Sequence, residues 1–189
     1  MKKIYSKTGD DGQTALINGE RLAKDSLVFE VLGTLDEFNA SLGVLLANWQ
    51  ETFSPKTGLT QTKDIALQKR FLFDLQKQLF KLGAEIAKSP SVKLQNSFLE
   101  RMEKNIDQLQ NQLGKDFWSN FVLPGGSQLA AQVDLARTIC RRLERRLVAL
   151  DAERDLRDIL IKFVNRTSDY LYILRSYINH ELKVKEIPV

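Results

Sequence analysis

Residues 121–146 read FVLPGGSQLAAQVDLARTICRRLERR and combine a break in the chain with a dense group of arginines. A proline and two glycines interrupt the chain, and Ser127 then stands where a helix N-cap residue is expected. From there apolar residues recur at spacings of three and four, which indicates a helix with one buried face. This apolar stripe consists of Leu129, Val133, Ala136, Cys140, Leu143, Leu147 and Leu150. The segment therefore predicts a long helix that begins near Ser127.

The polar side of this helix carries five arginines, with only Glu144 among them as a counter-charge. Four residues turn a helix by about 400°, so positions 137, 141 and 145 form one slowly drifting stripe and positions 142 and 146 a second one. Three interpretations fit: a solvated face, a surface for acidic partners, or a site for a polyanion. Guanidinium groups suit the last two because they bind phosphate and carboxylate in a bidentate way. The five are Arg137, Arg141, Arg142, Arg145 and Arg146.

The same periodicity predicts four more helices, at roughly 28–49, 63–88, 94–113 and 155–183. Ser89-Pro90 ends the second helix, and Gly114 stands in a C-cap position after the third. Residues 1–27 lack a helical period and are expected to be irregular, with strand-like alternation limited to Lys3–Ser6. Five helices with mostly short connections predict an all-α five-helix bundle over 28–183, within a single domain of 189 residues.

Composition excludes several classes of protein. The net charge of +4 is mild for a protein that coats nucleic acid. A single cysteine, Cys140, excludes an internal disulfide, and without CxxC or CxxH spacing a structural zinc site has no ligand set. The N-terminus has no apolar segment of a signal peptide, and no apolar run approaches the ~18 residues of a membrane span. We therefore expect a soluble cytoplasmic protein that binds neither membrane nor nucleic acid.

Two further segments carry polar residues in unusual patterns. Residues 7–14, KTGDDGQT, contain two glycines three apart, which can turn backbone amides toward a phosphate, although a plain turn is the better interpretation of this segment taken alone. Residues 33–39, GTLDEFN, place Asp36 and Glu37 inside the first helix. Gly33 costs a helix about 1 kcal/mol relative to alanine, which suggests the close approach of another element. The acidic pair could meet the arginine row within one chain or across an interface.

A catalytic nucleophile is hard to find in this sequence. The only histidine, His180, lies near the C-terminus, and we expect it at the surface. Cys140 falls on the apolar stripe, and we expect it in the core. Residues 165–170, NRTSDY, place Asn165 and Asp169 on one face of the last helix, where they fit either a polar site or packing between helices. If the protein is an enzyme, the attacking group should come from a cofactor or a substrate.

Six segments, in this order along essentially the whole chain, resemble the PduO-type ATP:cob(I)alamin adenosyltransferases, also called corrinoid adenosyltransferases. The resemblance implies a five-helix bundle with an irregular N-terminal nucleotide-binding loop. It also implies a homotrimer that holds ATP between neighbouring subunits, cobalamin as the second substrate, and Mg²⁺ on the triphosphate. The segments are YSKTGDDGQT at 5–14, KD at 24–25, GTLDEFN at 33–39, FVLPGG at 121–126, ARTICRRLER at 136–145 and NRTSDY at 165–170.

The resemblance also implies roles for particular residues. The loop would wrap the triphosphate through its backbone amides, Phe121 would lie against the lower face of the corrin ring, and no side chain would ligate a metal. Asp36 would pair with Arg137 across the subunit boundary. The residues implied in catalysis are Arg141, Phe121, Asp36 and Arg137. The residues implied in nucleotide binding are Lys7, Thr8, Gly9, Asp10, Gly12, Thr14, Lys24, Arg141, Glu144 and Asn165.

The implied reaction transfers the 5′-deoxyadenosyl group of ATP to cobalt and releases triphosphate. Cobalt(I) is itself the nucleophile, which agrees with the missing protein nucleophile. A flavoprotein reductase and an adenosylcobalamin-dependent enzyme are the further partners that the resemblance suggests.

The chain departs from the family at three positions: Asp134 replaces a histidine found in many members, and Thr167 and Arg175 stand where apolar residues are commoner. Three other functions are alternatives for such a helical bundle: a nucleotide or corrinoid carrier, a helical nucleic-acid-binding protein, and a scaffold bundle. The nucleic-acid alternative leaves the glycine loop and Asp36 unexplained, and it predicts binding that falls steeply with salt.

Overall fold

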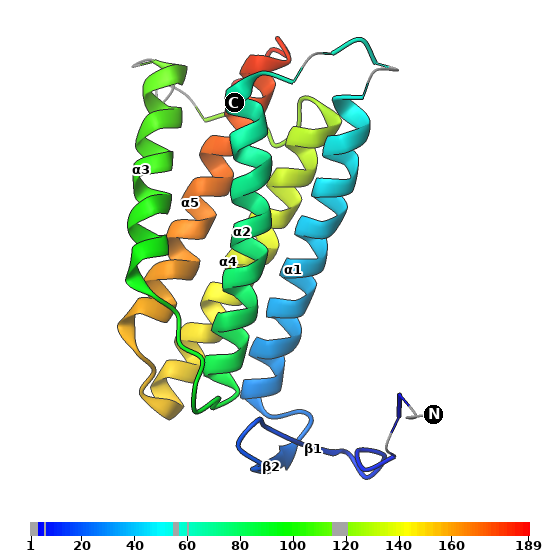
Figure 1. Ribbon diagram of the computed structural model, residues 1–189, viewed down its shortest axis with the longest axis vertical. Coiled ribbons are helices and arrows are strands. Elements are labelled where there is room, and N and C mark those ends of the chain that lie inside the picture. The colour runs from blue at the N-terminus through cyan, green and yellow to red at the C-terminus, as the bar shows by residue number, and fades with distance from the viewer. Residues whose placement is uncertain (1–3, 6, 55–56, 60, 115–120) are drawn as a thin grey trace.

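A computed structural model of the protein describes residues 4–5, 7–54, 57–59, 61–114 and 121–189. Five long helices lie side by side, and a small two-stranded sheet caps the end of the bundle where the first helix begins (Figure 1). The predicted five-helix bundle is confirmed. The elements are β1 Gln13–Ala15, β2 Arg21–Ala23, α1 Leu27–Thr52, α2 Lys63–Ile86, α3 Asn96–Leu113, α4 Gln128–Arg154 and α5 Asp158–Glu181.

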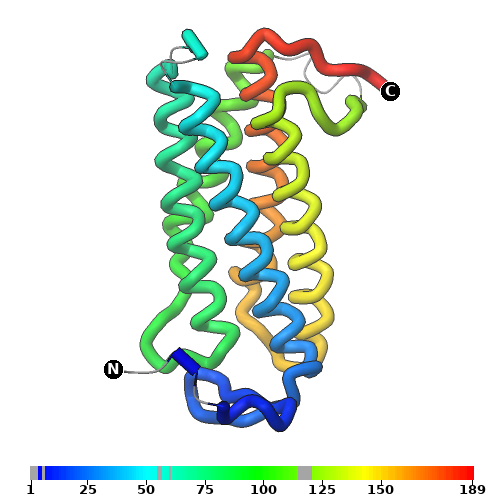
Figure 2. The backbone as a smooth tube through the Cα atoms, turned by 90° about the vertical axis from the view of Figure 1, so that its right-hand side faces the viewer, coloured from blue at the N-terminus to red at the C-terminus, as the bar shows by residue number. Residues whose placement is uncertain are grey.

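Successive helices run in opposite directions along the bundle axis (Figures 1 and 2). Helix α4 packs against both α1 and α5, α3 packs on α5, and α2 packs on α1. The helix that carries the arginines is therefore flanked on two sides, and only its remaining face is open. No helix among the described residues has the length and hydropathy needed to cross a membrane.

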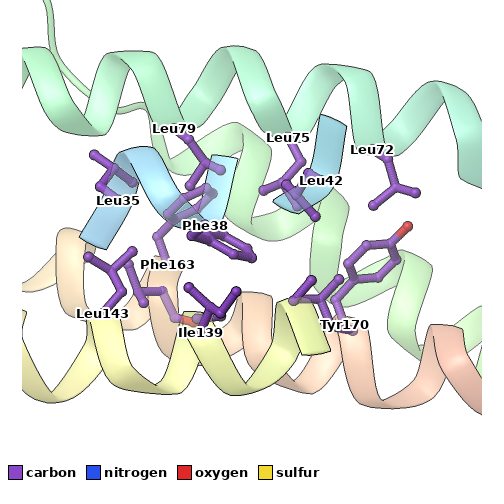
Figure 3. Packing of buried hydrophobic residues seen from close by; sticks show 14 of the residues in the cluster. Leu35, Phe38, Leu42, Leu72, Leu75, Leu79, Ile139, Leu143, Phe163 and Tyr170 are labelled. Carbon is purple, nitrogen blue, oxygen red and sulfur yellow. The ribbon is translucent and has the colours of Figure 1, made fainter. Parts of the chain in front are cut away.

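The core forms where the apolar stripes of the helices face one another (Figure 3). All seven residues of the predicted α4 stripe are buried, including Cys140. Phe38 and Leu42 of α1 meet Leu75 and Leu79 of α2 in the same cluster. Each such side chain contributes about 1.5–3 kcal/mol through removal of apolar surface from water. Packing of these stripes, more than local propensity, therefore holds the helices in place.

The predicted helix ends are confirmed by their caps. The Ser127 hydroxyl accepts a hydrogen bond from the Ala130 amide at 3.2 Å, which satisfies one of the free donors at the start of α4. Gly114 adopts a φ of 85° directly after α3, a conformation that glycine takes without penalty. The Ser127 cap fixes where α4 begins, and thus which of its residues lie at each level of the bundle.

The expectation that residues 1–27 are irregular is wrong in part, because β1 and β2 pair as an antiparallel hairpin. Gly19, with a φ of 88°, lies in the connecting turn, and buried Leu16 anchors the hairpin on the bundle. The Ile17 amide donates to the Ala87 carbonyl at 3.0 Å, which ties the hairpin to the end of α2. Strands of three residues are too short for alternation to reveal them. Lys3 and Ser6, the ends of the expected strand-like segment, lie outside the described residues.

Candidate functional site

The predicted nucleotide loop forms a tight turn ahead of β1. The Asp10 amide donates to the Lys7 carbonyl and the Gly12 amide to the Gly9 carbonyl, both at 3.4 Å. Lys7 and Gly12 adopt left-handed φ values of 63° and 81°. For a lysine this conformation costs about 1–2 kcal/mol, and such strained residues are concentrated at ligand sites. The loop is therefore a shaped backbone segment rather than an open coil.

Two cations from the hairpin lie against this loop. The Lys24 amide donates to the Gly12 carbonyl at 2.9 Å, and a Cβ atom at Gly9 would lie 3.1 Å from Lys24 Nζ, so the ammonium sits on the glycine. Arg21 donates to the Thr8 carbonyl at 3.0 Å and pairs with the Asp11 carboxylate at 3.3 Å. Lys24 was predicted from the sequence and Arg21 was missed, because its position opposite the loop follows only from the hairpin pairing.

The arginine row of α4 divides into halves with different partners. Arg142 forms an ion pair with Glu37 of α1, and Arg146 forms one with Glu30 at 3.1 Å. Arg146 also donates to the Thr34 hydroxyl. The stripe of positions 142 and 146 is thus a contact between α4 and α1. The acidic pair inside α1 meets the arginine row within one chain, but through Glu37 rather than Asp36.

The other stripe brings three predicted nucleotide-binding residues together. Arg141 is exposed, and its guanidinium forms no ion pair with any described residue. Glu144 lies three residues further along, on the same helix face. Its carboxylate accepts a hydrogen bond of 2.7 Å from the Asn165 side chain of α5. An unpaired cation and a polar pair therefore share one stretch of the open α4–α5 surface.

Asp36 and Arg137 do not meet within the chain. The Arg142–Glu37 pair sets the register of α4 against α1, and Arg137 lies five residues earlier in α4. Five residues displace it by about 7.5 Å along the axis and rotate it by about 500°, onto another side of the helix. Arg137 instead pairs with Asp134 at 3.0 Å. Asp36 is exposed and borders a shallow groove with Phe80.

The expectation that another element approaches Gly33 closely is wrong within the described part of the chain. A Cβ atom at this position would have no neighbour within 4 Å. The glycine stands on an exposed face of α1, so the cost of its flexibility is not explained by packing within one chain.

The segment 121–126, which begins with Phe121, lies at the opposite end of the bundle from the hairpin, beside the C-terminal segment (Figure 2). The Phe121 side chain is 86% exposed, which is unusual for a phenylalanine. Val122 forms an antiparallel bridge with Pro188. One chain therefore places the nucleotide loop and Phe121 far apart, with the Arg141 surface on the helix that runs between these two ends.

The two residues considered as nucleophiles lie apart from these groups. Cys140 is fully buried, and burial raises the pKa of its thiol far above the usual range. His180 is exposed near the end of α5, as predicted. Neither side chain belongs to the loop or to the Arg141 surface.

The chain as a whole is similar to known proteins of one family. The sequence model of the family described as cobalamin adenosyltransferase matches residues 4–178. The corrinoid adenosyltransferase of Bacillus subtilis is 35% identical over 180 residues, covering 94% of this chain and 86% of the relative. A corrinoid adenosyltransferase of Citrobacter freundii is 36% identical over 178 residues, covering 91% and 92%.

Solved structures show the same fold. A PduO-type ATP:corrinoid adenosyltransferase from Lactobacillus reuteri, a variant complexed with cobalamin and ATP, aligns with a TM-score of 0.84 at 29% identity over 99% of both chains. Another variant of that enzyme, complexed with ATP, aligns with a TM-score of 0.83. The residues matched by the family's sequence model include the loop, the arginine helix and nearly all of α5. The resemblance seen in the sequence is thus confirmed: the chain belongs to the cobalamin adenosyltransferase family.

Proposed function

We propose that this protein transfers the 5′-deoxyadenosyl group of ATP to the cobalt of cob(I)alamin, giving adenosylcobalamin and triphosphate. The observation that carries the proposal is that one family match runs from the N-terminal loop through α4 into α5. The reaction balances without a protein nucleophile. Cobalt(I) donates an electron pair to C5′, the C5′–O bond breaks, and triphosphate leaves with that bond's electrons, so cobalt ends formally as cobalt(III).

The nucleotide end of the proposed site is cationic. The shaped loop from Lys7 to Thr14 would hold the triphosphate through backbone amides, with Lys24 adding charge beside Gly9. The Arg141 guanidinium, which forms no ion pair with a described residue, would stabilise the charge that develops on the leaving group. Asn165, held by Glu144, would contact the nucleotide. Their task is to orient the two substrates and to spread negative charge, which are the main sources of rate enhancement in group transfer.

The cobalt end of the proposed site is apolar. The exposed ring of Phe121 would cover the lower face of the corrin, excluding water and the cofactor's own base. Loss of the lower ligand lowers the energy of the reduced metal relative to its precursor. Reduction to cobalt(I), which must come before the transfer, becomes easier for that reason.

Magnesium would reach the site with ATP. Within the ranges that the structure describes, no three His, Cys, Asp or Glu side chains form a cluster that could hold a metal ion. Mg²⁺ commonly binds substrate phosphates with one or two carboxylates rather than an all-protein cage. In our proposal the ion therefore arrives bound to the nucleotide. When bound, it would neutralise part of the charge on the triphosphate.

Assembly into a homotrimer would complete the site. Because one chain separates the loop from Phe121, a neighbouring subunit has to supply one half, and Asp36 would then meet Arg137 of the next chain. An apolar rim supports this role for the surface around Asp36: Phe80 and Ile17, which line the same groove, are 73% and 58% exposed. We place the enzyme in the cytoplasm, with a flavoprotein reductase supplying cobalt(I) and an adenosylcobalamin-dependent enzyme taking the product.

The proposal is tested by mixing the protein with ATP and chemically reduced cobalamin under anoxic conditions. We expect the absorption spectrum of cob(I)alamin to be replaced by that of adenosylcobalamin, and only when ATP and protein are both present. A persistent cob(I)alamin spectrum in the complete mixture would refute the enzymatic function. Binding of ATP or corrinoid without conversion would instead support the carrier alternative.

A further inference from the structure

Four charged side chains with little access to solvent lie at the end of the bundle that carries Phe121. Arg175 of α5 is 1% exposed, and its Nη1 lies 3.6 Å from Asp134 Oδ2 and 3.4 Å from Glu186 Oε1. Arg137 joins the cluster through Asp134 at 3.0 Å. The charges of the two arginines are compensated by those of the two carboxylates. Buried charge is tolerated only when it is compensated in this way, so the cluster is specified by its members jointly.

The cluster fixes the Pro-Gly-Gly break that follows Phe121. Asp134 Oδ2 accepts a hydrogen bond from the Gly125 amide at 3.3 Å. Asn179 donates to the Gly125 carbonyl at 3.1 Å and to Glu186 Oε1 at 3.2 Å. A Cβ atom at Gly126 would collide with the Asn179 amide group, so only glycine fits there. The chain on one side of Phe121 is thus anchored to α4 and α5 by the same groups that hold Glu186.

Glu186 belongs to the C-terminal segment 184–189, which runs beside the Phe121 backbone. The Leu123 amide donates to the Ile187 carbonyl at 2.8 Å, and the Val189 amide donates to the Phe121 carbonyl at 2.9 Å. Because the Phe121 ring is exposed, its own packing does not fix it. The backbone at Phe121 is held by this pairing instead.

We propose that Arg175 and Glu186 are positioning residues for Phe121. Their buried ion pair anchors segment 184–189, the segment pairs with the chain around Phe121, and the ring is thereby held at the place where it meets the corrin. The proposal rests on the proposed function, since only that function gives Phe121 a task. Neither residue touches a substrate, and their effect passes through the backbone pairing.

The test uses Glu186→Gln in the full-length protein, because this variant keeps the size and hydrogen-bonding capacity of the side chain but removes its charge. The matched control is Glu103→Gln, since Glu103 pairs with another arginine of α5, Arg166, at 3.0 Å. The first readout needs no corrinoid: hydrogen exchange of the Leu123 amide. We expect exchange to be about tenfold faster in Glu186→Gln and unchanged in Glu103→Gln. Unchanged exchange in Glu186→Gln would overturn the anchoring.

The second readout is turnover from the cobalt(II) corrinoid with a reductant. Glu186→Gln should lower kcat several-fold with an unchanged KM for ATP, and it should add nothing to a Phe121→Ala variant. Equal losses in the two backgrounds would show that Glu186 does not act through Phe121. A wild-type protein without turnover would instead mean that the proposed function has failed, whereas normal turnover in Glu186→Gln beside an active wild type would overturn only the positioning role.

Discussion

At the scale of single residues, the arginines of α4 differ by their partners rather than by their number. Arg142 and Arg146 are neutralised by acids of α1, and Arg137 by Asp134. Arg141 forms no ion pair with the part of the chain that the structure describes. A guanidinium without a carboxylate partner is the one that can bind a phosphate without first breaking a contact. The sequence pattern predicted a cationic row, but only the packing of α1 shows which members remain available.

Replacement of Arg141 by alanine should therefore affect catalysis far more than replacement of any other arginine on the stripe of positions 137, 141 and 145. We expect kcat/KM to fall by about 10²–10³-fold, since a charge-assisted contact to the developing negative charge is lost. Arg145→Ala is the control, because Arg145 is also exposed and lies one turn further along. Steady-state kinetics with cob(I)alamin and ATP measure both variants. Near-wild-type kcat and KM in Arg141→Ala would remove Arg141 from the mechanism.

Phe121 leads to a different prediction, because its task concerns cobalt and not ATP. Phe121→Ala should leave the KM for ATP unchanged and slow the reaction that starts from cobalt(II), since the lower face of the corrin loses its apolar cover. The reaction that starts from preformed cobalt(I) should suffer less. The ratio of the two rates is the measurement, and an unchanged ratio would contradict the shielding role.

Two departures from the family pattern are explained by each other. Arg175 and Asp134 are two of the three positions at which the sequence differs from the pattern expected from the resemblance, and the local sequence explains neither. In the structure Arg175 is buried beside Asp134 and Glu186. An acid at position 134 supplies the charge that a buried arginine requires. Such compensation joins residues far apart in the sequence, so no local pattern could have predicted it.

At the scale of elements, the sequence predicted the helices well and the hairpin not at all. Helix α4 begins where Ser127 provides a cap, and its stripe of seven apolar residues is buried throughout, because periodicity over many turns is a strong signal. The strands β1 and β2 have three residues each, which leaves no period to detect. The hairpin and its contact with the end of α2 arise from tertiary packing.

An ion pair between Glu85 of α2 and Arg157, the residue before α5, leads to a prediction about pH. Glu85 Oε2 accepts hydrogen bonds of 2.8 Å from both Arg157 and the Leu94 amide. Burial alone would raise the pKa of Glu85, but these hydrogen bonds outweigh it and bring the pKa below its ordinary value of 4.5. A lowered folded-state pKa contributes stability that is present above the unfolded value and is lost as the pH falls through the folded one.

Glu85→Gln should therefore lower the free energy of unfolding by about 1 kcal/mol at pH 7. The effect is no larger because Arg157 is partly exposed and solvent screens its charge. The difference in the free energy of unfolding between variant and wild type should shrink as the pH falls below 4.5. Urea denaturation at several pH values measures it. The control is Asp158→Asn, whose side chain is 86% exposed and pairs only with Lys162 among the described residues. A difference that stays constant from pH 7 to pH 3.5 would contradict the assigned role.

At the scale of the whole molecule, the two parts of the proposed site lie at opposite ends of the bundle. The six segments along the chain led to a set of proposed site residues, but their order did not predict that the loop and Phe121 lie far apart. That separation depends on the direction of each helix, and in our proposal a second chain bridges it. The proposed trimer and the proposed Asp36–Arg137 contact are thus one hypothesis with two consequences.

Asp36→Asn tests this hypothesis. If Asp36 meets Arg137 of a neighbouring subunit, the variant should dissociate at a higher concentration than wild type in sedimentation experiments, and its KM for ATP should rise. Glu37→Gln is the control, since Glu37 pairs with Arg142 within the chain. A variant that keeps the wild-type assembly and KM would show that the pairing across subunits is wrong.

The step that defines the proposed function is the transfer of C5′ of ATP from the triphosphate to cobalt. The most direct test is a reaction of cob(I)alamin with ATP labelled with ¹³C at the 5′ carbon, followed by NMR of the corrinoid and by analysis of the released phosphates. We expect the label to appear in a cobalt–carbon bond and one triphosphate to be released for each adenosylcobalamin formed. Release of ADP and phosphate with no label on the corrinoid would contradict the proposed function.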